Sequence, residues 1–225
     1  MSANQAEREA GEWMLAGLAA SVLALLLFAW LATQVAEHST IAFDASVRDF
    51  VHRHSSPALT ELMLFLTWFG EPGVLFILGA AVFIGMAAAG WRTSALAFLI
   101  TMIGALVLDA TLKSAFHRSR PVSFFGTPEP ASYSFPSGHA LFAVCYFGSL
   151  AALLSERTTS NAKRAVIWIL AVFFAFMIGF SRVYLGVHYP SDVLGGYAAA
   201  VIWVGAVAHG ENLLLRRRKR ARGES

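Results

Sequence analysis

The sequence is poor in charged residues and in cysteine. Charged side chains make up 14% of its 225 residues and hydrophobic side chains 57%, whereas a soluble domain has about 25% and about 45–50%, respectively. This composition argues against a soluble globular protein, and the high hydrophobicity excludes a disordered chain. Cys145 is the single cysteine, so a scaffold held together by disulfides within the chain is also excluded.

Long apolar runs take the place of the missing charges. At about 20 residues for each crossing, six spans use about 120 residues and leave short loops. We therefore expect an all-α integral membrane bundle of six transmembrane helices, with residues 1–225 forming a single domain. The first run is too long for the apolar part of a signal peptide, so we expect it to remain as a helix. The runs predict spans at Trp13–Val35, from near Pro72 to Ala89, and at Thr93–Leu112, Ser137–Leu154, Ala165–Ser181 and Pro190–His209.

The second span has an irregular beginning. Pro57–Phe69 is apolar but only about a dozen residues long, which is short for a crossing. Gly70-Glu71-Pro72-Gly73 then interrupts the helix. The pattern fits either a short interfacial or re-entrant helix that precedes the span, or a single kinked span. Glu71 is predicted to line an entrance.

The positive charge of the chain is concentrated at its C-terminal end. The net charge is +3, and the last ten residues, Arg216 to Ser225, contain six basic residues and one acid. A basic tail can bind nucleic acid or anionic lipid, but directly after an apolar segment it typically marks a cytoplasmic helix end. We therefore expect no nucleic-acid partner, and we predict that residues 1–12 and 210–225 are cytoplasmic.

Two connections between the apolar runs are long. Glu37 to Ser56 is interpreted as a polar connection, and its His52 and His54 resemble a metal-binding pair only superficially, because no further ligand follows at a zinc-like spacing. We expect exposed loop histidines there and no metal site. The loop from Ser114 to Pro136 is the other long connection, and loops of this length in compact domains are often functional.

Three clusters of polar residues fall at helix ends, and counting the spans back from the tail puts all three on the outer face. Anchoring of the helices requires none of them, and charges at membrane depth are costly and tend to be functional. The clusters are Lys113 to Pro121, Pro136-Ser137-Gly138-His139, and Ser181-Arg182 with His188 and Asp192.

The residue types in these clusters describe an anion-binding site. Lys113, Arg120 and Arg182 supply fixed positive charge, and the two guanidinium groups suit the geometry of phosphate oxygens. Ser137 and Gly138 open a helix, whose free N–H groups and positive dipole end favour an anion. Each basic residue taken alone is an ordinary helix-end anchor, so the complete set carries the prediction.

Two histidines and a carboxylate complete the set. One histidine can attack a substrate while the other carries a proton. Pro190 suits the first position of the last helix, so Asp192 falls in the first turn, within reach of the His188 ring. A carboxylate there fixes the tautomer of the imidazole and stabilises the positive charge that develops on attack.

Together the clusters resemble the three-part signature of the type 2 phosphatidic acid phosphatase superfamily. That signature reads K-x6-R-P, P-S-G-H and S-R-x5-H-x3-D, and every position is matched between residues 113 and 192. The six-span layout extends the resemblance to most of the chain. The resemblance implies a phosphatase for lipid phosphates that needs neither metal nor cofactor. Together with the rule that basic residues flank the cytoplasmic ends of spans, it also implies a multi-pass protein of the inner (plasma) membrane, with the active site facing the periplasm or outside.

The resemblance also implies a role for each matched residue. His188 would be the nucleophile that forms a phosphohistidine, and Asp192 would orient it. His139 would protonate the leaving oxygen and later activate water. The phosphoryl oxygens would be held by Lys113, Arg120, Ser137, Gly138 and Arg182.

Two further residues are expected to support these. Asp109 lies one helical turn before Lys113, a spacing that permits an ion pair. Arg118 lies two residues before Arg120, and we predict that it supports the site or adds a phosphate contact.

The sequence leaves the substrate open, and it does not indicate an oligomeric state. We favour undecaprenyl diphosphate, with phosphatidate or phosphatidylglycerophosphate as the alternatives. A vanadate-dependent haloperoxidase is a further alternative within the same superfamily. Another class of function is a transporter or a non-catalytic lipid-binding membrane protein, but the almost wholly apolar span centres argue against a transport pathway.

Overall fold

In the part of the chain that the structure describes, the fold is built from α-helices without a strand. The computed structural model describes residues 3–126 and 131–221, with side chains for residue 11 and for residues 15–126 and 131–214. Residues 127–130 of the long loop and the side chains of nearly all of residues 1–12 and of the basic tail lie outside this description. The helices are α1 Ala3–Ala36, α2 Ile41–Arg53, α3 Pro57–Phe69, α4 Pro72–Ala88, α5 Arg92–Phe116, α6 Gly138–Ser155, α7 Asn161–Tyr184 and α8 Pro190–Ala221.

Most of these helices are membrane spans by length and composition. Five of them, α1, α5, α6, α7 and α8, are long and apolar enough to cross a membrane. α3 and α4 meet the same criterion only as a pair, which is bent by 51° at its break. The all-α membrane bundle is thereby confirmed, with up to six crossings if the bent pair forms one span. The two interpretations of residues 57–69 both stay predictions.

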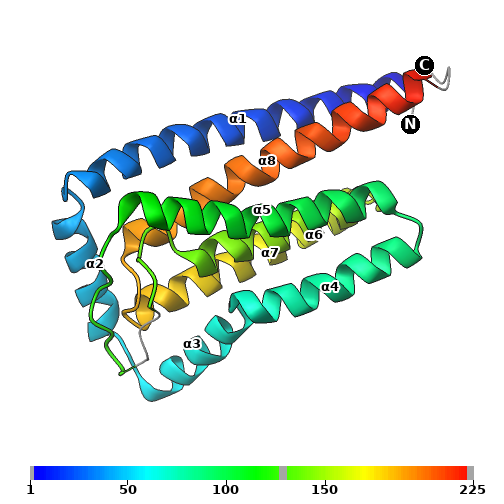
Figure 1. Ribbon diagram of the computed structural model, residues 1–225. Coiled ribbons are helices and arrows are strands. Elements are labelled where there is room, and N and C mark those ends of the chain that lie inside the picture. Colours follow the sequence, from blue (N-terminus) through cyan, green and yellow to red (C-terminus); the bar gives the residue numbers. More distant parts are fainter. Residues whose placement is uncertain (1–2, 127–130, 222–225) are drawn as a thin grey trace.

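The break between α3 and α4 follows from its sequence. Gly70 is the residue at which α3 ends, and Pro72 is the first residue of α4. Proline has no backbone N–H and clashes with the preceding helical turn, so α3 cannot continue through it. Figure 1 shows the pair running beneath the bundle from the end that holds α2 toward the opposite end.

Residues 37–56 are not the loop that the sequence predicted. They contain α2, which lies across one end of the bundle (Figure 1). The reason is a set of inward-facing residues at helical spacing. Asp44 in this set is fully buried, and Val47 and Val51 belong to an apolar cluster with Val183 of α7 and Val193 of α8. The polar residues between these positions made the segment resemble a loop in the sequence. The helix is too short to span a membrane.

The centre of the bundle is α6. It packs against α4, α5, α7 and α8, and it is the most buried of the candidate spans. α1 packs along α8 on the outside of the bundle. It leaves large apolar side chains such as Leu23 and Leu26 uncovered, as expected for a surface that faces lipid. The N-terminus of α6, which carries the P-S-G-H motif, is therefore held in the middle of the bundle.

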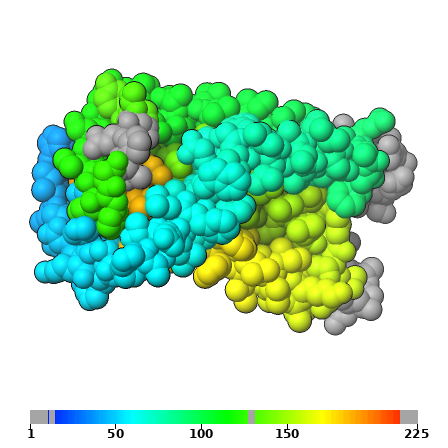
Figure 2. All heavy atoms as spheres, turned by 90° about the horizontal axis from the view of Figure 1, so that it is seen from below, coloured from blue at the N-terminus to red at the C-terminus, as the bar shows by residue number. Residues whose placement is uncertain are grey.

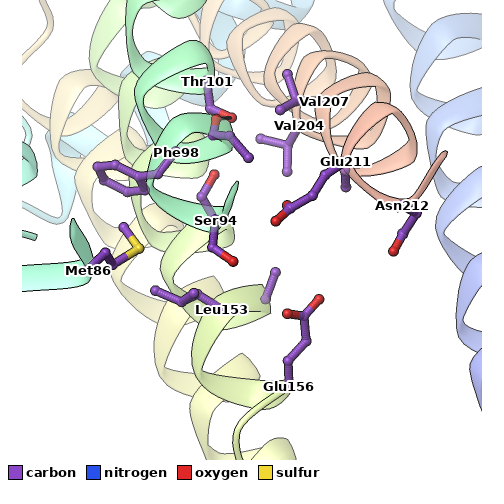
Figure 3. A pocket seen from close by; sticks show the side chains of 14 residues that line it. Met86, Ser94, Phe98, Thr101, Leu153, Glu156, Val204, Val207, Glu211 and Asn212 are labelled. Atoms are coloured by element: carbon purple, nitrogen blue, oxygen red, sulfur yellow. Dashed lines mark hydrogen bonds between the residues drawn. The ribbon is translucent and has the colours of Figure 1, made fainter. Parts of the chain in front are cut away.

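A small pocket lies among α5, α6 and α8 near the end of the bundle where both termini lie (Figure 3). Its volume is about 70 Å³, and Glu156 and Glu211 are among its lining residues. It is at the opposite end from the three polar clusters, so it takes no part in the site described next.

Candidate active site

The three polar clusters meet at the end of the bundle opposite the termini. Lys113 lies near the end of α5, the P-S-G-H motif opens α6, Arg182 lies near the end of α7, and His188 lies in the turn before α8. Figure 2 shows a hollow at this end between α3, in cyan, and the green loop that follows α5, with orange atoms from around the start of α8 at its bottom. The spacing along the chain is large, but the helix ends bring the residues together.

His188 is held at both ring nitrogens. Its Nδ1 lies 3.3 Å from Asp192 Oδ2, and Arg120 Nη1 donates to its Nε2 at 2.9 Å. Because a guanidinium can only donate, Nε2 accepts, and the proton of the neutral ring is on Nδ1, facing the carboxylate. The expected reach of Asp192 to His188 is therefore present, and the lone pair of Nε2 is directed at the cationic cluster.

Asp192 is itself fixed by several donors. The Tyr189 backbone N–H donates to its Oδ2 at 2.9 Å, and Arg118 Nη1 donates to its Oδ1 at 2.6 Å. The Ser134 hydroxyl also hydrogen-bonds this fully buried carboxylate. Such a set of donors limits the rotation of the carboxylate.

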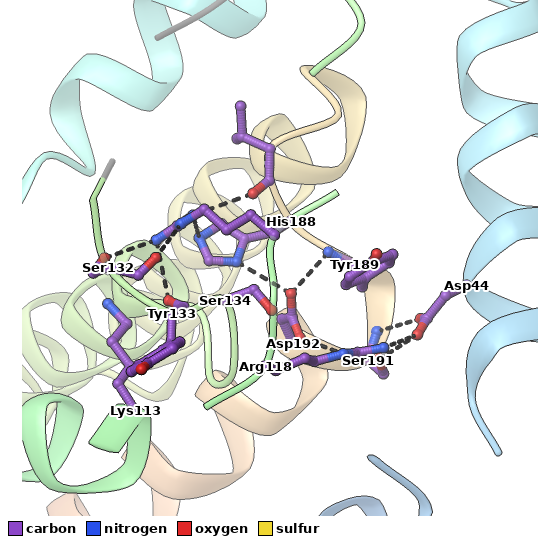
Figure 4. A network of polar contacts seen from close by, with 12 residues as sticks. Asp44, Lys113, Arg118, Ser132, Tyr133, Ser134, His188, Tyr189, Ser191 and Asp192 are labelled. Atoms are coloured by element: carbon purple, nitrogen blue, oxygen red, sulfur yellow. Dashed lines mark hydrogen bonds and ion pairs between the residues drawn. The ribbon is translucent and has the colours of Figure 1, made fainter. Parts of the chain in front are cut away.

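Arg118 bridges two buried carboxylates. Its Nη1 contacts Asp192, and its Nη2 donates to Asp44 Oδ2 at 2.7 Å and to the Thr40 hydroxyl at 2.9 Å. Asp44 also accepts from the backbone N–H and the hydroxyl of Ser191, at 2.9 and 2.6 Å. Figure 4 shows the guanidinium between the two aspartates. Both terminal nitrogens of Arg118 are thus engaged by buried carboxylates, which suits the predicted supporting role.

Arg120 is anchored by the loop that carries it. Its Nε donates to the Ser132 carbonyl at 2.7 Å, and its Nη2 donates to the Ser132 hydroxyl at 3.0 Å. Its Nη1 reaches the Val187 carbonyl at 3.2 Å as well as His188. These contacts fix the plane of the guanidinium beside the imidazole.

Lys113 and Asp109 form the expected ion pair on one face of α5. Lys113 Nζ donates to Asp109 Oδ2 at 2.9 Å. The pair lies against Gly138, where an added Cβ would be 2.9 Å from Asp109 Oδ1 and 3.2 Å from Lys113 Nζ. Glycine at this position therefore makes room for the ammonium group next to the N-terminus of α6.

Arg182 is almost completely buried near the end of α7. Its Nη1 donates to the Thr67 hydroxyl on α3 at 2.7 Å, while its Nε has no hydrogen-bond partner. A buried guanidinium that keeps a free donor is well suited to an anion.

Polar atoms without partners gather at this site. In the described part of the chain, six buried polar side-chain atoms lack a hydrogen-bond partner. Buried polar groups are nearly always paired, so each of these atoms calls for an explanation. Four of them belong to residues that the sequence singled out: Asp109 Oδ1, Ser137 Oγ, His139 Nε2 and Arg182 Nε.

The positive charges of the cluster also affect the pKa of His188. Burial lowers the pKa of His188 well below its ordinary value of 6.5, and the positive charges of Arg120, Arg182, His139 and Lys113 act in the same direction. The ring is consequently neutral near pH 7, and a neutral imidazole is the nucleophilic form.

His139 meets a residue from the α3–α4 break. Its Nε2 lies 3.2 Å from Glu71 Oε2, although the contact does not have the geometry of a hydrogen bond. Gly70 packs directly against Ile178 on α7, and a Cβ there would lie 3.2 Å from His139 Cδ2. The break is therefore closely fitted to the α6 N-terminus.

Sequence reasoning missed the second layer of the site. Asp44, Thr40, Ser191, Ser134 and Thr67 all contact residues of the clusters. The signal that could have revealed Asp44 is its place among the inward-facing residues of α2, three and seven residues before Val47 and Val51 at helical spacing. The others are ordinary hydroxyl residues that no spacing distinguishes.

The chain is similar to several known proteins. Residues 94–214 match the model of the PAP2 superfamily. The chain is 31% identical to phosphatidylglycerophosphatase B of Bacillus subtilis strain 168 over 180 residues, which covers 79% of this chain and 87% of that protein. It is 30% identical to an undecaprenyl-diphosphatase of Sulfolobus acidocaldarius over 162 residues, or 70% and 73% of the two chains. The crystal structure of a transmembrane PAP2-type phosphatidylglycerolphosphate phosphatase from Bacillus subtilis matches with a TM-score of 0.78 and 28% identity, covering 85% of this chain and 96% of that one.

Proposed function

Because this chain belongs to the PAP2 superfamily and is a membrane lipid phosphatase of that type, we propose that it removes the terminal phosphate of a lipid diphosphate, with undecaprenyl diphosphate as the first candidate. The reaction passes through a phosphohistidine on His188 and requires no metal ion. The observation that carries this proposal is the contact of Arg120 with Nε2 of a neutral His188, amid donors that lack partners.

In the first step His188 is the nucleophile. Its Nε2 attacks phosphorus in line with the bridging oxygen, and the P–O bond breaks with its electron pair passing to that oxygen. His139 donates a proton to the leaving oxygen. Asp192 accepts the Nδ1–H hydrogen bond and stabilises the positive charge on the phosphorylated ring.

The phosphoryl oxygens are held by the cations and the α6 N-terminus. Lys113, Arg120 and Arg182 neutralise the charge on the equatorial oxygens, and the Ser137 hydroxyl and the Gly138 backbone N–H donate to them. Such pre-arranged donors are the main source of rate acceleration in phosphoryl transfer.

In the second step water replaces the imidazole. His139, now neutral, takes a proton from water, and the resulting hydroxide attacks phosphorus. The P–N bond breaks with its electron pair returning to Nε2, and inorganic phosphate leaves. The enzyme then has both histidines in their initial states.

The choice of lipid rests on the relatives. The Sulfolobus acidocaldarius relative is named for undecaprenyl diphosphate, whereas the Bacillus subtilis relative and the matching structure are named for phosphatidylglycerophosphate. Both lipids carry a second phosphate in addition to the terminal one, which suits a site with three cations. Phosphatidate carries only one, so we expect it to be the poorest of the three substrates.

The orientation rests on the charge rule. Basic residues between α6 and α7 and after α8 favour a cytoplasmic location for that end of the bundle. The site is then extracytoplasmic, and the protein is a single-domain enzyme of the inner (plasma) membrane with both termini in the cytoplasm.

The experiment that tests the function is phosphate release by the purified protein in detergent with EDTA present. We expect release from undecaprenyl diphosphate and phosphatidylglycerophosphate, with phosphatidate slower by about tenfold, the effect of losing roughly one charge-assisted contact. EDTA is expected to leave the rates unchanged. Complete inhibition by EDTA would disprove metal independence, and an absence of release from all three lipids by folded protein would disprove the proposed activity.

A glycine substitution tests the phosphate-binding role of Lys113. Gly138→Ala is expected to lower kcat/KM by about 10- to 100-fold, because the new methyl group displaces the ends of the Lys113 and Asp109 side chains, and misplacement by about 1 Å costs up to about 100-fold. Stability is expected to change little, since only flexible side-chain ends must move. Gly148→Ala is the matched control on the same helix, because nothing lies within 4 Å of its added Cβ. Equal kinetics of the two variants would contradict the role of Lys113.

A further inference from the structure

The α3–α4 break contacts two residues of the site through two side chains. Thr67, near the end of α3, accepts from Arg182 at 2.7 Å, and Glu71, in the break, lies 3.2 Å from His139 Nε2. The tight packing of Gly70 against Ile178 holds the backbone of the break in this place. The position of Glu71 is thus set by the fold and not by a mobile surface loop.

The charges around His139 give this contact its significance. The charged groups that act on His139 are Lys113 from α5, Arg182 from α7 and Glu71 from the break, and His188 faces it from the turn before α8. Cations oppose the addition of a proton to an imidazole, and a carboxylate favours it. Glu71 is the acidic member of this set, so it offsets the cations that the phosphate requires.

We propose that Glu71 is a positioning residue that keeps on His139 the proton that His139 gives to the leaving oxygen. The inference rests on the proposed function, because it assigns a purpose to Glu71 only if His139 is the acid of the first step. The cations bind the phosphate, but the same cations work against an acid beside it. A carboxylate next to His139 partly offsets the effect of the cations.

Glu71 also connects the buried imidazole to solvent. The His139 side chain is 10% exposed and the Glu71 side chain is 58% exposed. An exposed carboxylate exchanges protons with water rapidly and is ionised at neutral pH. His139 can therefore recover its proton through Glu71 when the lipid covers the rest of the site.

The leaving group provides the means to test this role. When a phosphate ester is cleaved, the leaving oxygen becomes an alkoxide, a strong base that needs a proton in the transition state. When a diphosphate is cleaved, the leaving oxygen belongs to a phosphate, which is stable without one. Loss of the proton on His139 therefore impairs esters far more than diphosphates.

The experiment compares Glu71→Gln with the wild-type protein on two short-chain probes, dioctanoyl phosphatidate and farnesyl diphosphate. At pH 8 we expect kcat/KM to fall by about tenfold for phosphatidate and by less than about twofold for farnesyl diphosphate. The alkaline limb of kcat/KM for phosphatidate is expected to move about one pH unit lower, because His139 loses its proton more readily without the carboxylate. Glu71→Asp keeps the charge and is expected to restore part of the shift.

Glu61→Gln is the matched control, since Glu61 is exposed on the adjoining α3; it is expected to behave as wild type. An equal loss on both probes with an unmoved alkaline limb would overturn the proposal, because it would indicate a structural role. A gain in activity would overturn it too, since it would mean that Glu71 only repels the anionic substrate. Failure of the wild-type protein to cleave either probe, or full activity of His188→Ala, would instead refute the proposed function itself.

Discussion

His188→Ala is expected to abolish phosphate release from every lipid, by at least about 10⁴-fold in kcat, the scale found when a covalent nucleophile is removed. The reason is that Nε2 of His188, 2.9 Å from Arg120 Nη1, is the proposed attacking atom, while Asp192 Oδ2 lies 3.3 Å from Nδ1 and stabilises the positive charge that develops on the ring. The measurement is phosphate release in detergent, with trapping of the phosphoenzyme by acid-sensitive, base-stable labelling.

The variant is expected to fold. Asp192 loses one partner but keeps the Arg118 guanidinium and the Tyr189 backbone N–H, so no buried carboxylate is left without a partner. Normal elution and helicity in detergent would verify this. A folded variant that still releases phosphate at more than about 1% of the wild-type rate would contradict the nucleophilic role.

The pH dependence of the wild-type protein follows from the same residue. Since burial and the neighbouring cations hold the pKa of His188 well below 6.5, its nucleophilic, neutral form persists as the pH falls below that value. The acidic limb of kcat/KM that is due to the titration of His188 is therefore expected well below pH 6.5 in the pH profile of the wild-type protein.

Arg118→Gln is expected to have the second-largest effect, and it acts on both stability and activity. Removal of one partner from a buried ion pair costs about 3–5 kcal/mol, and here two fully buried carboxylates lose the same guanidinium. The thermal midpoint in detergent is expected to fall by roughly 10 °C. At a temperature where the variant is folded, kcat is expected to fall by about 100-fold, because Asp192 no longer holds His188 in one orientation.

A second substitution separates these two effects. Asp44→Asn removes the other buried charge, so the double variant Asp44→Asn with Arg118→Gln is expected to regain stability but not activity, since Asp192 still lacks its Arg118 hydrogen bond. The coupling is read from a double-mutant cycle. Arg53→Gln serves as the control, because Arg53 is an exposed arginine at the end of the same α2 helix. Recovery of activity in the double variant would show that Arg118 acts only through stability.

The sequence predicted the features that depend on local patterns, such as apolar runs and polar residues one helical turn apart. The apolar runs predicted the membrane bundle, and the pairing of Lys113 with Asp109 and of His188 with Asp192 followed from four-residue spacings within or next to a helix. Local spacing is reliable here because helical geometry fixes which side chains are neighbours.

The contacts between distant segments could not be predicted in the same way. Asp44 reaches Arg118 across 74 residues, and Thr67 reaches Arg182 across 115. Such contacts depend on the tilt of α2 and on the bend between α3 and α4, which the packing of the whole bundle determines. For the same reason the sequence predicted a loop in place of α2: its buried face contains the carboxylate of Asp44, so it does not stand out as an apolar stripe.

The location of the site at one end of the bundle has a consequence for how such proteins diversify. The residues that would handle the phosphate occupy helix ends and the connecting loop, while the lipid-facing sides of helices such as α1 only need to stay apolar. Substitutions that keep the lipid-facing sides apolar are therefore expected to leave the reaction unchanged, so these sides can vary widely among related chains.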